Sequence, residues 1–355
     1  MKYRLFFAAF ALGVAILPIQ EGSAQEFPYQ VFERYLEPLA QQIGMPGLSA
    51  VIVRNNRIEW DRGYGFSDVD SRTPAGIDTP YAIGGVTQAV TAVLIGVCAD
   101  RFRFDIEQPI RAFVPTYPYN VSIRHVLAHA TDTAYRYDPA NYTALTTVVE
   151  QCSQTPYRVA TAVEVLNRLR MGSSVPGLDL ARQEGAAAGL LFDPDTLRRY
   201  QTLLGRVASP YRIDRDGRHS RSEYPSYGLD AAGGLVATAR DLYEFESALD
   251  RGEPLSRSTL NQMWSQAIVF NGNGNRIQTP TGLGWFVQNA SSEQPLVWTF
   301  GHIPDASSAL ILKLPRKNLT LILLSNSGGL AQGFNFEQGD VTTSPFVKVF
   351  LRLFV

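Results

Sequence analysis

The residues with the clearest chemical pattern run from Tyr81 to Gln88 and lead into an apolar stretch from Ala89 to Ala99. Apolar side chains fill nearly every position of that stretch, which predicts a helix buried on most of its circumference. The Gly84-Gly85 pair permits close backbone approach at its start. A helix N-terminus carries unpaired N–H groups and a partial positive charge, so Gly85 and Val86 would suit an anionic group or a developing oxyanion.

Positions 85 and 88 share one helix face, which is the spacing at which a serine nucleophile and a lysine base would meet. The residues here are Gly85, which has no side chain, and Gln88, whose amide is no base near neutral pH. Thr87 is the nearest hydroxyl, but its position two residues after Gly85 points to another face of the helix.

The segment from Tyr81 to Asp105 resembles the start of the helical domain in class C β-lactamases, penicillin-binding proteins and related serine esterases. In that superfamily a serine opens the helix and a lysine follows three residues later. The resemblance implies an α+β fold, in which the two ends of the chain form one antiparallel sheet with N- and C-terminal helices. It also implies a mainly helical domain inserted between those ends. Gly85 and Gln88 occupy the serine and lysine positions.

A second resemblance covers Tyr137 to Tyr142, which aligns without gaps on the family segment Tyr-Ser-Asn-x-x-Tyr. The resemblance implies that the first tyrosine shuttles protons and that the asparagine binds substrate. Pro139 stands at the asparagine position, so a side-chain donor and acceptor are lost together. Tyr137 keeps its place and is predicted to line the cleft.

The third motif of the family is Lys or His, then any residue, then glycine, and Gly301 to Asp305 resembles it. His302 is the candidate cationic residue. Pro304 takes the glycine position, where it adds bulk and removes an N–H from the strand on which a substrate would dock. Departures at all three motifs predict that the fold is kept without its reaction.

Two histidines, His125 and His129, lie four residues apart in a predicted helix from Ile123 to Ala130. This spacing can bind zinc, but Val126 stands where a metalloprotease helix has its glutamate. We interpret both as packed or partly exposed side chains and expect no metal or other cofactor.

The first residues form a basic start, an apolar run from Leu5 to Ile19 and a small-residue site ending at Ala24. This layout is typical of a secretory signal peptide, so we expect residues 1–24 to be removed and the protein to be exported to the periplasm or the cell exterior. No membrane span is expected after cleavage. An uncleaved anchor is the alternative.

The periodicity of the remaining chain predicts a sheet-containing region over residues 25–78 and 228–355, and an inserted helical region over 79–227. Residues 171–189 and 209–225 are rich in Gly, Ser, Pro and charge, and are predicted to be surface loops at the edge of the cleft. The expected helices are 27–43 and 345–355, and the expected strands are 48–53, 58–64, 282–287, 295–300, 308–314 and 319–325.

The composition argues against two classes of partner. Lysine and arginine number 32 against 33 aspartates and glutamates, a balance that favours neither nucleic acid nor an anionic membrane. Export would permit a disulfide between Cys98 and Cys152, but both lie in apolar helical patterns, which favours buried free thiols.

Three functional hypotheses follow from these features. The leading one is an exported, non-catalytic relative of these enzymes that retains a cleft for a small carboxylate or a peptide-like ligand. The second is a hydrolase of ester, amide or β-lactam bonds with an altered mechanism, using Thr87 with Tyr137 or His302. The third is a structural or protein-interaction module of the cell envelope. Oligomeric state does not follow from the sequence.

Overall fold

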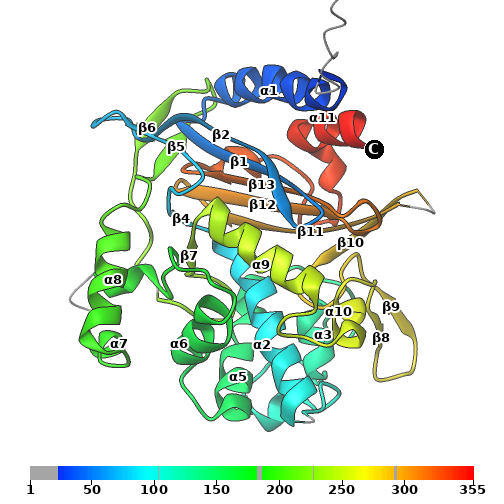
Figure 1. Cartoon of the computed structure of the whole chain (residues 1–355). Helices are drawn as coiled ribbons and strands as arrows, with labels where there is room; N and C mark the ends of the chain where they lie inside the picture. Colours follow the sequence, from blue (N-terminus) through cyan, green and yellow to red (C-terminus); the bar gives the residue numbers. More distant parts are fainter. Residues whose placement is uncertain (1–22, 103, 182–185, 227, 292–293) are drawn as a thin grey trace, which may run out of the picture.

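The computed structural model describes residues 23–102, 104–181, 186–226, 228–291 and 294–355. Its centre is a seven-stranded antiparallel sheet built from strands of both ends of the chain (Figure 1). The strand order is β10-β11-β12-β13-β1-β2-β3, and β13 pairs with β1 so that Ser325 lies opposite Leu48. The strands are β1 Gly47–Arg54, β2 Arg57–Asp68, β3 Thr73–Pro74, β10 Phe286–Ser291, β11 Gln294–Ile303, β12 Ser307–Leu314 and β13 Leu319–Ser325.

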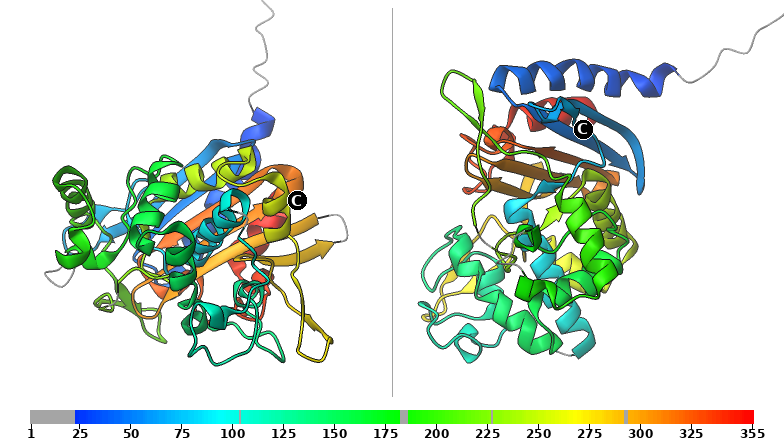
Figure 2. Two further views of the ribbon diagram at one scale, coloured as in Figure 1. Left: turned by 90° about the horizontal axis from the view of Figure 1, so that it is seen from below. Right: turned by 90° about the vertical axis from the view of Figure 1, so that its left-hand side faces the viewer.

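Helices α1 (Ser23–Ile43) and α11 (Pro345–Phe354) lie side by side on one face of this sheet (Figures 1 and 2). Phe32 and Phe350 are fully buried there, and their rings meet edge to face at 5.8 Å. The expected α+β architecture with terminal helices on the sheet is confirmed. Asn55 and Asn56 form the turn between β1 and β2, because both residues adopt the positive φ that a tight hairpin of this kind requires.

The opposite face of the sheet carries the helical part of the molecule, with α2 (Thr87–Phe102) at its centre. A 3₁₀ turn over Gly84–Val86 leads into α2. The α2 residues from Thr87 to Cys98 are buried. Gly84–Phe102 is the one helical segment among the described residues that is long and apolar enough to cross a membrane. Because 72% of it is buried inside the fold, it is the core helix that the sequence predicted.

The helical part also contains α9 (Ala239–Arg251), and shorter elements complete the described chain. The helices are α3 Ile123–Leu127, α4 Pro139–Tyr142, α5 Leu145–Ser153, α6 Tyr157–Ala160, a π-helical segment Thr161–Asn167, α7 Ala186–Gly189, α8 Pro194–Leu204 and α10 Arg257–Met263, with 3₁₀ turns at Ile110–Ala112, Leu178–Ala181, Pro315–Lys317, Gly328–Leu330 and Val341–Thr343. The two-stranded pairs are β4 Tyr81–Ala82 with β7 Val236–Ala237, β5 Tyr211–Ile213 with β6 His219–Arg221, and β8 Ile268–Phe270 with β9 Arg276–Gln278.

Three predicted segments differ from the structure. Residues 209–225 contain the β5–β6 hairpin, and 171–189 contain a 3₁₀ turn and α7, with residues 182–185 outside the described part. Neither segment contributes to the wall of the cavity described below. The strand expected at 282–287 begins only at Phe286, because Gly284 adopts a φ of 83° and turns the chain against Ala92 of α2.

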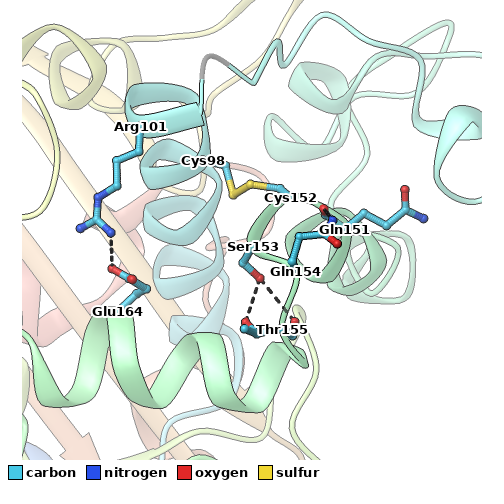
Figure 3. The surroundings of a disulfide bond; sticks show 8 residues. All are labelled: Cys98, Arg101, Gln151, Cys152, Ser153, Gln154, Thr155 and Glu164. Carbon is cyan, nitrogen blue, oxygen red and sulfur yellow. Dashed lines mark hydrogen bonds and ion pairs between the residues drawn. A yellow bond between two sulfur atoms is a disulfide. The ribbon is translucent and has the colours of Figure 1, made fainter.

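The expectation of free thiols is wrong. Cys98 of α2 and Cys152 of α5 form a disulfide, with Cα atoms 6.1 Å apart (Figure 3). The apolar periodicity correctly placed both cysteines on packed helix faces, but periodicity does not report that α2 and α5 pack against each other at this point. An ion pair between Arg101 and Glu164 lies beside the bridge. The disulfide therefore joins the core helix α2 to α5.

We predict that removing this disulfide destabilises the protein by about 2–4 kcal/mol, because a closed loop between Cys98 and Cys152 restricts the unfolded chain. Urea unfolding with and without dithiothreitol measures the effect. The Cys98→Ser/Cys152→Ser variant is the control, since its unfolding midpoint should not respond to reductant. Equal midpoints for the oxidised and reduced native protein would contradict the prediction.

The start of α9 contains a buried carboxyl group. Thr238 caps the helix, with its hydroxyl accepting from the Asp241 N–H. Asp241 is 4% exposed, and its carboxylate accepts hydrogen bonds from Ser173 N at 2.8 Å and Ser174 Oγ at 2.7 Å. Burial nevertheless raises the pKa of Asp241 to about 6. The folded state therefore binds this proton more tightly than the unfolded chain does.

A pH dependence follows from this shift. The stabilisation that comes from protonating Asp241 is complete below the ordinary pKa of 3.8 and is lost as the pH rises through about 6. Relative to wild type, Asp241→Asn should therefore gain about 2–3 kcal/mol of unfolding free energy between pH 4 and pH 7. Urea titrations at several pH values would show it. Parallel stability curves for the two proteins would contradict the shift.

Candidate functional site

A cavity of about 430 Å³ opens at the start of α2, between the helical part and strand β11. Its floor is the Gly84-Gly85 backbone. Its wall brings together Tyr137 and His302, the two residues that the sequence singled out as cleft-lining. The remaining lining residues are Pro139, Ala140, Thr143, Asp230, Ala232, Gly233, Phe300, Pro304 and Glu337.

The Gly85 position is tight for a side chain. A β-carbon at residue 85 would lie 2.8 Å from the Phe300 carbonyl oxygen and 3.0 Å from the Tyr137 hydroxyl. A contact below 3.0 Å with a backbone atom requires the chain to shift. The space where a nucleophilic side chain would begin is thus occupied by β11 and by the Tyr137 hydroxyl.

Gln88 is buried beneath this floor and joins two neighbours. Its Oε1 accepts from His129 Nε2 at 3.1 Å, and its Nε2 donates to the Tyr137 hydroxyl at 3.5 Å. Because an amide oxygen only accepts, the neutral imidazole carries its proton on Nε2. His129 also stacks on Tyr142, whose hydroxyl donates to the Gln88 backbone carbonyl at 3.3 Å.

These groups are neutral near pH 7. Burial lowers the pKa of His129 to about 3, and burial raises the pKa of Tyr137 above its ordinary value of 10.0. Burial also lowers the pKa of His302, although Glu337 and Asp305 act in the opposite direction. A general base needs a pKa close to the working pH. His129, Tyr137 and Gln88 do not meet this condition.

The third motif lies where the resemblance placed it. His302 is on β11, half-buried at the cavity wall, and Pro304 lies just beyond the strand end. Gly301 of the same strand packs on the turn before α2, since a β-carbon there would lie 1.8 Å from the Ile83 carbonyl oxygen. The strand therefore approaches the helix start too closely for any other residue at position 301.

Two other expected contributors do not face the cavity. Thr87 is fully buried, and its Oγ1 accepts from Leu235 N at 3.3 Å, so it holds the β7 segment instead of a ligand. The Val86 N–H donates to the Ile83 carbonyl at 3.2 Å within the 3₁₀ turn, so it is not free for an anion as expected. Gly85, which is partly buried, remains as backbone that lines the cavity.

The predicted shared helix face for His125 and His129 is wrong. Helix α3 ends at Leu127, and His129 adopts a φ of 51°, a left-handed turn closed by the Ala130 N–H on the His125 carbonyl. His125 Nδ1 pairs with Ser122 Oγ, and its Nε2 pairs with the Phe270 carbonyl. Among the described residues no group of three or more metal-ligating side chains is found.

Sequence reasoning missed several lining residues. Asp230 and Glu337 supply the carboxylates of the cavity, and Phe300 supplies an aromatic wall 5.4 Å from the Tyr137 ring. Asp230 lies in a turn closed by the Ala232 and Gly233 N–H groups, and this turn belongs to none of the three motifs. Glu337 comes from an irregular loop, where no periodic pattern indicates its direction.

A larger hollow of about 870 Å³ lies elsewhere, beside β2 and β3. Its polar side chains largely bind one another: Asp68 accepts from Ser209 and Arg221, and Asp78 pairs with Arg240. We therefore place the candidate site in the smaller cavity, where motif residues converge.

Comparison with known proteins shows the family. The model of the β-lactamase family matches residues 32–338, so the chain belongs to that family. The resemblance stated from the sequence is confirmed.

Curated relatives are distant. Protein flp of Staphylococcus aureus strain MW2 is 22% identical over 329 residues, and that of strain N315 is 28% identical over 329 residues. Each match covers 84% of this chain and 63% of the relative, so the chain spans less than two thirds of these relatives' length.

Solved structures share the fold. An octameric penicillin-binding protein homologue from Pyrococcus abyssi has a TM-score of 0.69 at 20% identity, covering 85% of this chain and 74% of its own. The D-amino acid amidase of Ochrobactrum anthropi, complexed with L-phenylalanine amide, has a TM-score of 0.68 at 17% identity, covering 92% and 98%. A class C β-lactamase from Rhodobacter sphaeroides has a TM-score of 0.68 at 13% identity, covering 93% and 100%. These identities establish the fold alone.

We predict that Gly85→Ala destabilises the protein by about 1–3 kcal/mol, because the new methyl group meets the Phe300 carbonyl. Gly272→Ala is the matched control, since a β-carbon there has nothing within 4 Å. Thermal unfolding of both variants gives the comparison. A Gly85→Ala protein as stable as the control would mean that the helix start is not tightly packed on β11.

Proposed function

We propose that this protein is an exported, non-catalytic member of the β-lactamase family that retains a small-molecule cleft. The observation that carries the proposal is the packing at Gly85. The Phe300 carbonyl and the Tyr137 hydroxyl fill the place where a nucleophilic side chain would start. Residue 85 therefore lacks a nucleophile, and a side chain there would require the Phe300 backbone to shift.

The second support is the neutral network below the cavity floor. Gln88 replaces a residue that would have to accept a proton, and its partners His129 and Tyr137 are held neutral by burial, which shifts the pKa of each away from neutrality. Activation of a hydroxyl requires an adjacent base of suitable pKa. The three side chains supply hydrogen bonds instead.

The cleft itself supports ligand binding. Its volume of about 430 Å³ lies within the usual range for small-molecule sites, and it combines apolar walls with a few polar groups. The amidase with the same fold holds an amino acid amide, which is a ligand of comparable size. A peptide-like ligand is therefore the class to test.

Export rests on two features. The N-terminal sequence has the layout of a signal peptide. The Cys98–Cys152 disulfide is of a kind that persists in oxidising compartments such as the periplasm.

A hydrolase of altered mechanism is the second candidate. The hydroxyls that line the cavity are those of Tyr137 and Thr143, whereas Thr87 is buried away from it. Thr143 Oγ1 donates to Asp230 Oδ2 at 3.3 Å, which is the one pairing of a lining hydroxyl with a lining carboxylate that the described residues show. This arrangement makes Thr143 and Tyr137 the residues to inspect for covalent reaction.

We predict that intact-mass spectrometry detects no adduct after incubation of the purified protein with a β-lactam or, separately, with a fluorophosphonate. The physical reason is the absence of a side chain at residue 85 and of a base at residue 88. A class C β-lactamase treated in parallel shows that the reagents are active.

An adduct mapped to Tyr137 or Thr143 would establish the altered hydrolase and overturn the proposal. The Gly85→Ser/Gln88→Lys variant adds a second comparison. An adduct on this variant alone would indicate that the cavity still admits the reagents. If neither protein reacts although both are folded, binding must be tested directly, and an envelope interaction module becomes the alternative to examine.

A further inference from the structure

The carboxylates that line the cavity, Asp230 and Glu337, indicate the charge of the ligand that it binds. Resting on the proposed ligand cleft, we infer that this cavity binds a small protonated amine with an aromatic or apolar body, with the ammonium group between Asp230 and Glu337. The inference deepens the proposed function, because sequence patterns alone pointed to a carboxylate or a peptide-like ligand.

Asp230 is held in a fixed orientation. Its Oδ1 accepts from Ala232 N at 2.8 Å and Gly233 N at 3.0 Å, and its own N–H donates to the Gly233 carbonyl at 3.1 Å. Its Oδ2 accepts from Thr143 Oγ1 at 3.3 Å. A carboxylate oxygen has two lone pairs, so Oδ2 keeps capacity for a further donor from the cavity.

Glu337 is positioned by its backbone. The Glu337 carbonyl accepts from the Tyr135 hydroxyl at 2.6 Å, which ties the loop to the segment that carries Tyr137. Its side chain lines the cavity and is exposed. The negative charge of Glu337 acts on both Tyr137 and His302, since it raises the pKa of each.

No cation balances these two carboxylates within the cavity. Among the described residues that line it there is no lysine or arginine, and burial lowers the pKa of His302. A ligand carboxylate would meet like charge, which is unfavourable, whereas an ammonium group would gain charge-assisted hydrogen bonds.

The other walls suit an apolar body. The Tyr137 and Phe300 rings lie 5.4 Å apart, and both line the cavity together with Pro139 and Pro304. Aromatic faces also attract a nearby cation through their quadrupoles. An amine that carries a phenyl or similar group therefore matches both the charge and the surface of the hollow.

Three probes of nearly equal size and different charge test the inference: phenethylamine, 2-phenylethanol and phenylacetate. Isothermal titration calorimetry at pH 7 and low salt should show phenethylamine binding roughly tenfold more tightly than the alcohol, with phenylacetate weakest.

The double variant Asp230→Asn/Glu337→Gln should reduce the preference for amine over alcohol to about twofold or less, because it removes both charges. The new amide oxygen at position 230 can still accept from Ala232 N and Gly233 N, so the turn keeps its hydrogen bonds. Glu223→Gln, which changes an exposed acidic residue outside the cavity, is the matched control and should keep the preference.

The outcomes separate the two proposals. Three results would overturn the amine inference but leave the ligand cleft. The amine and the alcohol could bind equally, phenylacetate could bind more tightly than the amine, or the double variant could keep the preference for the amine. Failure of all three probes to bind folded protein would overturn both. Thermal unfolding of each variant verifies that a loss of binding is not a loss of fold.

Discussion

The close packing of strand β11 on the turn before α2 is the constraint on which the rest of the site depends. It needs glycine at three positions. Gly84 adopts a φ of 51°, a β-carbon on Gly85 would meet the Phe300 carbonyl, and one on Gly301 would meet the Ile83 carbonyl. With these three glycines the sheet and the core helix approach each other directly, and the cavity lies over the line of contact. A side chain at residue 85 would force β11 and the helix start to move apart locally.

A consequence of this packing is that the polar groups beneath the cavity are neutral. Burying an ion costs several kcal/mol unless it is paired, and the side chains of Gln88 and His129 are 3% and 7% exposed. An amide, an imidazole and a phenol satisfy one another at much smaller desolvation cost. Elsewhere the fold does bury charge, but with partners: Lys313, 2% exposed, pairs with Asp250 at 2.6 Å and Glu246 at 3.1 Å. Beneath the cavity no such counter-ion is present among the described residues that contact Gln88.

The local signals in the sequence were sufficient for the sheet and for part of the site. The Asn55-Asn56 turn, the apolar core helix and the Thr238 cap depend on neighbouring residues only, and the structure forms all three. Tyr137 and His302 were placed together by motif order, and both line the cavity.

Contacts between distant segments were not predictable in this way. The link from His129 to Gln88 depends on a left-handed turn at the end of α3, whereas periodicity extended that helix through His129. The Cys98–Cys152 bridge depends on how two helices pack, and Glu337 is tied to the cavity by the Tyr135 hydroxyl from 202 residues away. In each case the missing information is tertiary, because apolar periodicity reports which face is buried but not what buries it.

The proposed loss of the reaction and the proposed amine ligand are related through electrostatics. A site built for acyl transfer needs groups that stabilise developing negative charge, so carboxylates at its wall would oppose the reaction. Where no acyl transfer takes place, these carboxylates oppose no reaction step. Asp230 and Glu337 can then bind a ligand of positive charge. The same carboxylates that would weaken the binding of an oxyanion thereby become the basis of selectivity. The charge of the cavity and the glycine at residue 85 consequently support one interpretation, in which this site recognises a ligand and does not transform it.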